Sequence, residues 1–273
     1  MKRPGIKIIA GFLVVAVIAC ACGAFILIKM RSATQGAAGQ TIKHFSFSSP
    51  NEINEWEEKL LAHNNTSYTV TEHAGRKCVK GDGEDSASAL YCRQRLSWKR
   101  HPFVSWDWKA ESFPVRKKKE ALNKKAEFDF VAQVYVIFYS RFFLSTKAIQ
   151  YVWTEEIPAG TVSRSPYTKN VVLIVLESGL SEEWKHEERD IEEDYRELFG
   201  EELSKDVVAV SFMTDSDSTG TTSTAYYTNI EIGYLEKPED GIAKGGAKKS
   251  WYLRVPGIKK LFKSERKEKP SDT

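Results

Sequence analysis

An acidic loop offers the clearest metal chemistry in the chain. Asp215 and Asp217 are two positions apart, so in an extended segment both carboxylates point to one side. With the Thr219 hydroxyl and nearby carbonyls they supply the hard oxygen ligands that Ca²⁺ prefers, but the twelfth position, Tyr226, excludes an EF-hand. The favoured alternative is a network of side-chain bonds to backbone amides that shapes the loop. Calcium is the one cofactor that this pattern suggests.

Aromatic residues on predicted strands form a second candidate, a surface for carbohydrate. Two tryptophans two positions apart, and a Tyr-Val-Trp segment further on, each place their rings on one face of a strand. Sugar rings stack their C–H faces on such rings, while charged side chains bond the hydroxyls. Burial of the same rings in a β-sandwich core is the favoured interpretation. The residues of the candidate ligand face are Trp106, Trp108, Trp153, Arg189 and Asp190.

Acid–base catalysis is a third interpretation. Carboxylates are numerous around Glu187 and Asp190, which makes these two the pair to test. His186 lies close in sequence to Ser178, yet the chain has no nucleophile elbow and no glycine-rich phosphate loop. The mixed charges here are more typical of a structural ion-pair network, so enzymatic activity stays open and a non-catalytic role is favoured. The expected network comprises Arg189, Asp190, Asp194 and Arg196.

Two cysteines are candidates for a disulfide. Cys78 and Cys92 lie in strand-like segments joined by a loop rich in Gly, Asp and Ser. Antiparallel pairing about residue 85 would place the two sulfurs opposite each other, which suits a bridge in an oxidising compartment. Two buried free thiols are the equal alternative.

Short strands separated by turn residues run through most of the chain. Apolar runs at 171–176 and 207–213 are typical of buried strands, and a lysine-rich insert at 116–125 interrupts the series. Two or three short helices are expected, among them 51–62 and one that ends at Gly200. The pattern predicts an all-β fold, a jelly-roll-like β-sandwich, rather than a parallel α/β sheet. The other predicted strands are 42–47, 67–71, one at Lys77, 87–96, 103–111, 131–139, 148–154 and 224–232.

The N-terminal region predicts a membrane attachment. Residues 8–28 carry no charge and are long enough to cross a hydrocarbon core of ~30 Å as one transmembrane helix. Basic residues before this run favour a cytoplasmic N-terminus, which places the bulk of the chain in the periplasm or outside the cell. A cleaved signal peptide and a lipoprotein lipidated at Cys20 are the alternatives.

Charge and composition set the domain limits. The chain has 40 basic and 37 acidic residues, a net charge of +3, which is too balanced to argue for nucleic acid. Small polar residues follow the apolar run as a flexible spacer, and basic residues dominate the C-terminal end, where we expect disorder. The expected regions are an anchor at 1–31, a spacer at 32–41, a β-sandwich domain at 42–235 and a basic tail at 236–273.

A set of motifs recurs at characteristic spacing along the chain: Trp106-Asp-Trp108, Asp129-Phe130, Tyr151-Val-Trp153, Trp184, Arg189-Asp190, Asp194-Tyr195-Arg196, Phe199-Gly200, Asp215-x-Asp217-x-Thr219 and Ala225-x-Tyr227. With these motifs the chain resembles a bacterial family, the domain of unknown function 3047, over roughly Phe45 to Ile232. The family is similar to galactose-binding-like jelly rolls, which implies that fold and a glycan ligand. The chain departs from the family at Phe130, where a second aspartate is usual, and at Ser218, where asparagine is usual.

Together these observations predict a membrane-anchored envelope protein with a non-catalytic β-sandwich binding domain. A glycan or another envelope polymer is the expected ligand. The alternatives are a hydrolase that acts on such polymers and a scaffold that binds another envelope protein.

Overall fold

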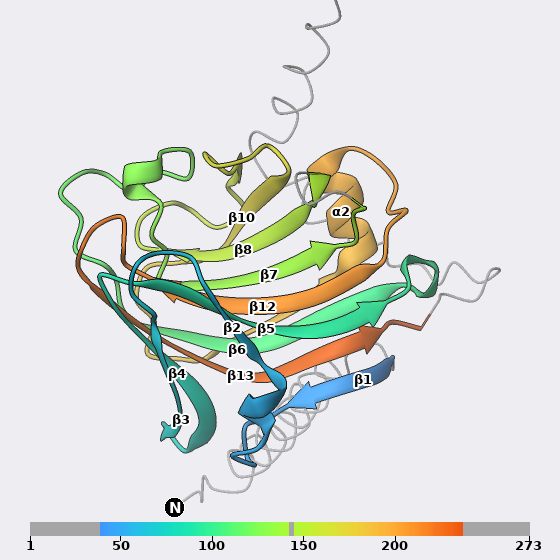
Figure 1. Cartoon of the computed structure of the whole chain (residues 1–273), viewed down its shortest axis with the longest axis horizontal. Coiled ribbons are helices and arrows are strands. Elements are labelled where there is room, and N and C mark those ends of the chain that lie inside the picture. Colours follow the sequence, from blue (N-terminus) through green and yellow to red (C-terminus); the bar gives the residue numbers. More distant parts are fainter. Residues whose placement is uncertain (1–38, 142–144, 237–273) are drawn as a thin grey trace, which may run out of the picture. The chain divides into compact units, whose positions relative to one another are not determined.

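The computed structural model describes residues 39–141 and 145–236, and its strands and helices are labelled in Figure 1. The predicted membrane helix, Cys20, most of the spacer and the basic tail lie outside the described residues. Within these ranges, no helix combines the length and the apolar character that a membrane span needs.

Two β-sheets make up the described domain. The first sheet has six strands in the order β11-β6-β13-β4-β3, with β1 also paired to β13, and the second has seven in the order β2-β5-β12-β7-β8-β10-β9. The chain passes repeatedly from one sheet to the other, as in a jelly roll, and the predicted β-sandwich is confirmed. The strands are β1 Gln40–Phe45, β2 Glu57–Leu60, β3 Ser67–His73, β4 Arg76–Glu84, β5 Ala87–Leu96, β6 Pro102–Ser112, β7 Ala132–Phe138, β8 Ala148–Thr154, β9 Val162–Arg164, β10 Val171–Ser178, β11 Lys185–Asp190, β12 Val207–Asp215 and β13 Thr222–Tyr234.

The main core fills the space between the sheets. Alternate residues of β6 point inward and meet alternate residues of β8, so that the Trp106 and Tyr151 rings lie 5.3 Å apart. Phe212 of β12 and Tyr227 of β13 meet in the same way, at 4.7 Å. Burial of these rings, together with the other apolar side chains of the core, stabilises the fold.

A second, smaller core lies against part of the seven-stranded sheet. Val152 of β8 with Leu173 and Val175 of β10 contact Phe128 and Phe130, which belong to the segment between β6 and β7. Alternate residues of these strands line the main core, so the smaller core lies on the opposite, outer face of the sheet. The predicted lysine-rich insert is therefore anchored on this face by apolar contacts.

The helices agree only partly with the expectations. The helix α2, Ile191–Phe199, ends at Gly200, whose φ of 72° is the left-handed conformation typical of a helix C-terminus, and this prediction is confirmed. The helix expected at 51–62 is wrong: a 3₁₀ turn, Glu52–Glu55, leads directly into β2, which pairs with β5. Sheet pairing satisfies the backbone of that segment and overrides its helical periodicity.

Of the two alternatives for the cysteines, the structure agrees with buried free thiols and not with the bridge. Both Cys78 and Cys92 are buried free thiols, and they belong to strands of different sheets. Cys78 lies in β4, which pairs with β3 and β13, whereas Cys92 lies in β5, which pairs with β2 and β12. The loop between β4 and β5 therefore carries the chain from one sheet to the other instead of closing a hairpin.

Candidate functional site

The tryptophans of the predicted ligand face are core residues. Trp106, Trp108 and Trp153 are each 0% exposed. Their rings meet edge to face, with centroids 5.4 Å apart for Trp106 and Trp108 and 5.6 Å apart for Trp108 and Trp153. A ligand in solvent cannot reach them, so their assignment to a carbohydrate surface is corrected.

Arg189 and Asp190 likewise serve the fold. The Arg189 guanidinium donates two hydrogen bonds to Asp194, of 2.9 and 2.5 Å, and the two side chains are only 13% and 1% exposed. Asp190 accepts from the backbone N–H groups of Glu192 and Glu193, which caps α2. The predicted structural ion pair is confirmed for Arg189 and Asp194, whereas Arg196 is exposed. Neither Arg189 nor Asp190 lines the pocket that adjoins the acidic loop.

A different set of residues converges beside the acidic loop. Oxygen atoms of Asp129, Asp215 and Asp217 all lie within 4.8 Å of one another. The predicted pair Asp215 and Asp217 is thus brought together, and the third carboxylate is Asp129, which precedes β7. Thr219 contributes its backbone instead, because its hydroxyl bonds the Ser216 carbonyl. Asp129 stood out in the sequence only as part of the family motif.

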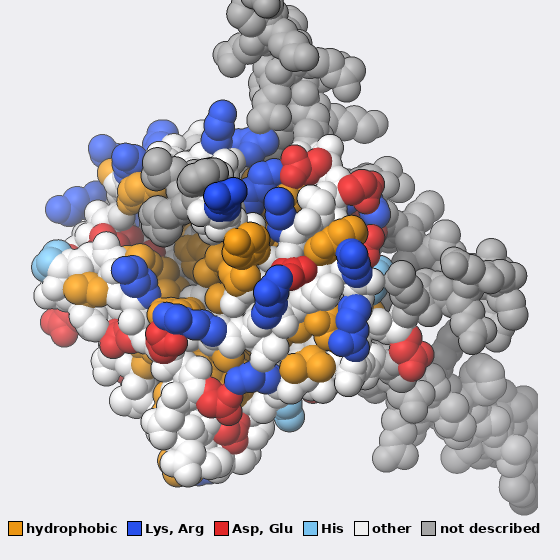
Figure 2. Space-filling model, turned by 45° about the vertical axis from the view of Figure 1, so that its right-hand side comes forward, with side chains coloured by type: hydrophobic (Ala, Val, Ile, Leu, Met, Phe, Trp, Pro, Cys, Tyr) orange, Lys and Arg blue, Asp and Glu red, His pale blue; other side chains and the backbone are white. Residues whose placement is uncertain are grey.

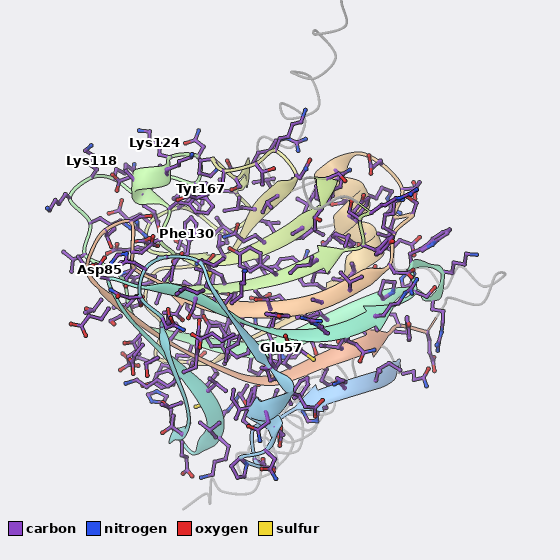
Figure 3. All side chains as sticks on the ribbon, viewed as in Figure 1. Glu57, Asp85, Lys118, Lys124, Phe130 and Tyr167 are labelled. Carbon is purple, nitrogen blue, oxygen red and sulfur yellow. The ribbon has the colours of Figure 1, made fainter. Side chains whose placement is uncertain are left out.

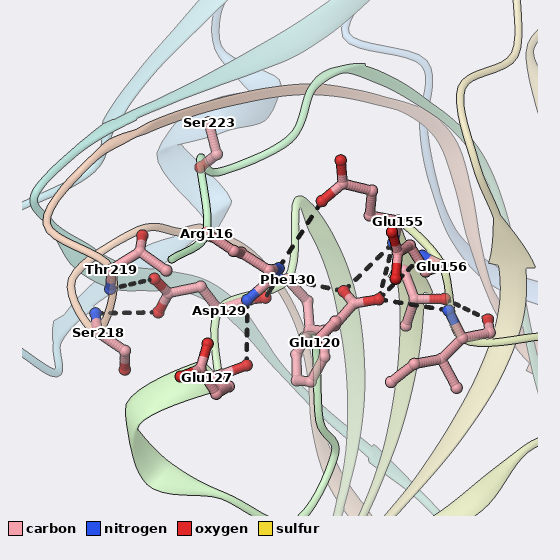
Figure 4. A network of polar contacts seen from close by, with 12 residues as sticks. Arg116, Glu120, Glu127, Asp129, Phe130, Glu155, Glu156, Ser218, Thr219 and Ser223 are labelled. Atoms are coloured by element: carbon pink, nitrogen blue, oxygen red, sulfur yellow. Dashed lines mark hydrogen bonds and ion pairs between the residues drawn. The ribbon is translucent and has the colours of Figure 1, made fainter. Parts of the chain in front are cut away.

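Backbone N–H groups hold this cluster in place (Figure 4). The two Asp129 oxygens accept from Ser218 N at 3.0 Å and from Thr219 N at 2.7 Å. Asp215 accepts from Phe130 N at 2.7 Å. The expected bonding of loop side chains to backbone amides is therefore present, but it ties two distant segments together as well as shaping one loop.

The cluster shifts the pKa values of two of its members. Burial, and then the charge of Asp129, raises the pKa of Asp215 well above its usual value. The same two causes, in the same order, raise the pKa of Asp217. The site therefore favours either a proton on Asp215 or a cation among the three carboxylates, since both relieve the repulsion. Hard oxygen ligands of this kind fit Ca²⁺.

A pocket of about 310 Å³ adjoins the acidic cluster on the outer face of the seven-stranded sheet. Aromatic and apolar side chains form most of its walls, and Gln150, Asp215 and Asp217 supply polar atoms. Tyr167 is the most accessible aromatic wall, with 56% of its surface exposed. Figure 3 shows Tyr167 and Phe130 at the same end of the sheets. The aromatic and apolar lining residues are Leu61, Ala87, Phe128, Tyr135, Tyr167, Val171 and Met213.

Hydrogen bonds fix the polar side chains of this face. Gln133 Oε1 accepts from Gln150 Nε2 at 2.6 Å and from the Tyr135 hydroxyl at 2.8 Å. Gln133 in turn donates to the Phe130 carbonyl at 3.3 Å. Burial raises the pKa of Tyr135 well above its usual value, so its hydroxyl keeps its proton. The polar groups beside the pocket are thus oriented before any ligand arrives.

A buried ion pair holds the neighbouring insert (Figure 4). Arg116 donates to Glu120 at 3.1 Å, and the two side chains are 5% and 1% exposed. Glu120 also accepts from the backbone N–H groups of Glu155, Glu156 and Ile157, at 3.1, 3.0 and 3.4 Å. The insert that carries Phe128 into the pocket wall is thereby tied to the loop after β8.

The candidate catalytic carboxylates lie elsewhere. Burial, and then the charge of Glu177, raises the pKa of Glu187 to about 7. Neither Glu187 nor Asp190, the candidate acid–base pair, lines the pocket. His186 contacts Asp107 at 2.6 Å, which agrees with an ion pair across β11 and β6. The geometry thus separates these carboxylates from the aromatic pocket.

Three solved structures are similar to this chain in fold. The first is the family 11 carbohydrate-binding module from Clostridium thermocellum in complex with a mixed-linked tetrasaccharide, with 11% identity, coverage of 74% of this chain and 100% of that chain, and a TM-score of 0.37. The second is the non-crystalline cellulose specific module CBM28, with 11% identity, coverage of 72% and 97%, and a TM-score of 0.37. The third is the cellulose induced protein Cip1, with 9% identity, coverage of 70% and 96%, and a TM-score of 0.41.

A search of curated proteins found no match to this chain. One family matches residues 54–231, which include β2 to β12 and most of β13. This span contains the acidic cluster, the pocket and the insert. The chain belongs to this family, which is described as proteins of unknown function, DUF3047.

Proposed function

We propose that the described domain binds a glycan, without catalysis, in the pocket between Tyr167 and the acidic cluster. The observation that carries the proposal is the pocket itself, a hollow of about 310 Å³ with aromatic walls and a few fixed polar groups. Ligand sites typically combine these two features. The pocket lies on a rigid sheet, so that little conformational entropy is lost on binding.

The walls suit a sugar ring. Tyr167 presents an exposed aromatic face, and its ring lies 5.5 Å from that of Phe128, which supports it edge-on. A pyranose stacks its C–H face on such a ring, while Gln150 and Asp217 at the pocket wall bond its hydroxyl groups.

The arrangement of the carboxylates supports binding rather than hydrolysis. Glycoside hydrolysis needs two carboxyl groups that both reach the scissile bond. Asp129 is 0% exposed and its two oxygens are occupied by N–H groups, and Asp215 is 4% exposed. Asp217 alone among the three is not buried, so the cluster presents one partly exposed carboxylate to a ligand.

Calcium is our proposal for the ion that the three aspartates would hold. Its role would be to neutralise the cluster and to stiffen the loop that forms one end of the pocket. This proposal rests on the convergence of the three carboxylates within 4.8 Å.

Membrane attachment outside the cytoplasm is also part of the proposal. The uncharged run at 8–28 and the basic residues before it support an anchored N-terminus. Protease added to spheroplasts that express the full chain should then degrade the domain. Protection equal to that of a cytoplasmic protein would contradict this location.

Substitution of Tyr167, the exposed wall residue, tests whether the pocket binds a glycan. A glycan array would first identify ligands, and calorimetry on the purified full chain would then compare Tyr167→Ala with Tyr139→Ala. Tyr139 is a matched control because it is similarly exposed, at 52% against 56%, and does not line this pocket. We expect Tyr167→Ala alone to weaken binding by about tenfold. No ligand on the array, or equal effects of the two variants, would sink the proposal.

A further inference from the structure

The insert beside the pocket presents only positive charge to solvent. Its segment 116–127 has eight charged residues, and three of them, Arg116, Glu120 and Glu127, have contacts inside the protein. The other five are exposed lysines, and no exposed acidic residue stands among them. They are Lys117, Lys118, Lys119, Lys124 and Lys125.

These lysines are held at a fixed place. The Arg116–Glu120 pair and the three backbone donors to Glu120 anchor the loop at its base. Leu122 and Phe128 of the same segment are buried in the smaller core on the outer face of the sheet. A charged loop fixed in this way loses less conformational entropy on binding than a flexible one.

The same loop borders the pocket. Lys125 Nζ lies 5.0 Å from the centre of the Tyr167 ring, and Phe128 is itself a wall residue. Figure 3 shows Lys118 and Lys124 at the end of the domain where Tyr167 lies. The face seen in Figure 2 has a hollow lined by hydrophobic side chains, with Lys and Arg side chains and some Asp and Glu side chains around it.

The acidic cluster does not cancel this charge. Asp129 and Asp215 are 0% and 4% exposed, so little of either carboxylate reaches solvent. The accessible carboxylate at the pocket is that of Asp217. On the other side, Lys169 is also exposed, next to the lining residue Thr168. The insert lysines and Lys169 therefore place positive charge beside the pocket.

We propose that the glycan bound in this pocket is an anionic polysaccharide, whose rings occupy the aromatic pocket while its acidic groups contact the insert lysines. This inference rests on the proposed glycan-binding function. A lysine ammonium is a point charge without the fork geometry of arginine, so the shared chemistry is a negative group on a sugar ring, either a carboxylate or a sulfate.

Two pairs of polymers test the charge requirement on the full chain. Polygalacturonate would be compared with its methyl ester, which keeps the rings and removes the carboxylates. Dextran sulfate would be compared with dextran, and the two pairs together separate carboxylate from sulfate. We expect the charged member of at least one pair to bind about tenfold more tightly and its binding to weaken with added salt, because exposed charges are screened.

Matched variants locate the charge on the insert. The triple variant Lys117→Gln, Lys118→Gln, Lys119→Gln should lose the preference for the charged polymer. The control triple variant Lys77→Gln, Lys99→Gln, Lys205→Gln removes the same number of charges from exposed positions outside the pocket lining. This control should keep the preference for the charged polymer. Both variants retain the basic residues beyond position 236, so any binding by that tail is common to them.

The outcomes separate the two proposals. Equal affinity for charged and uncharged polymers, with Tyr167→Ala weakening both, would overturn the anionic ligand and leave the glycan pocket standing. Equal loss of charge preference in both triple variants would also overturn the role of the insert. Binding of charged polymers that Tyr167→Ala does not change would overturn the pocket, and with it this inference.

Discussion

The backbone N–H of Phe130 donates a hydrogen bond of 2.7 Å to the Asp215 carboxylate, across 85 residues of sequence. This contact joins the segment just before β7 to the end of β12, and Asp215 lies next to Asp129 and Asp217. Because Asp215 is almost completely buried, its pKa in the folded protein differs from its pKa in the unfolded chain.

Asp215 should make the domain less stable as pH rises. Its pKa is raised in the folded state, so the folded protein holds a proton that the unfolded chain releases above about pH 3.9. Its contribution to stability is therefore complete below that value and is lost as pH rises through the folded pKa.

Asp215→Asn tests this effect because it keeps an oxygen acceptor for Phe130 N but cannot ionise. In urea denaturation with a chelator present, the variant should lose less stability between about pH 4 and 8 than the original protein. Parallel curves for the two proteins would contradict the prediction.

Calcium should offset the loss of folding stability that ionisation of Asp215 causes. A cation that binds the folded cluster and not the unfolded chain raises the midpoint of thermal unfolding. We expect a rise at about 5 mM Ca²⁺, and none in Asp217→Asn, which removes the most accessible of the three carboxylates. An unchanged midpoint for the original protein would end the calcium proposal.

Replacement of the core tryptophans should affect stability first. Trp108→Ala and Trp153→Ala remove fully buried rings, and each should cost about 3–5 kcal/mol of unfolding free energy. Denaturant titration measures this loss directly. A variant as stable as the original protein would contradict the placement of its ring in the core.

Local patterns in the sequence predicted most strands, the helix before Gly200 and the approach of Asp215 to Asp217. They could not show which face of a strand is buried, because alternation at Trp106 and Trp108 describes a core face and a ligand face equally well. They also missed β11, whose sequence Lys-His-Glu-Glu-Arg-Asp has no apolar alternation. Backbone pairing with β6 forms that strand, and single-sequence patterns do not show pairing partners.

Local sequence patterns could not place Asp129 beside the acidic loop either, because they do not show which distant segments meet. It reaches Ser218 and Thr219 across 89 and 90 residues, so a third acidic group at the loop follows from sheet topology alone. The pocket arises in the same way, since its lining residues come from β5, β7, β8, β10, β12 and the loops between strands. The outer face of the sheet becomes a site only when these segments meet.

Cleavage by trypsin can report how firmly the insert is held, because its lysines are sites for trypsin. Glu120→Ala would remove the buried carboxylate that pairs with Arg116 and the acceptor of three backbone N–H groups. Arg116 would keep only the more exposed Glu155, at 3.9 Å, and the backbone carbonyls of Glu127 and Asp129. Loss of one member of a buried ion pair costs about 3 kcal/mol or more, enough to raise the open population of the loop roughly a hundredfold. Trypsin should therefore cut within 117–125 much faster in Glu120→Ala than in the original protein.

Glu156→Ala is the matched control for this experiment. Glu156 lies in the loop that docks against Glu120, but its own side chain is exposed. Its cleavage rate should stay close to that of the original protein when sites are followed by mass spectrometry. Similar rates for all three proteins would mean that the smaller core alone holds the insert, and that the Arg116–Glu120 pair does not fix the lysines beside Tyr167.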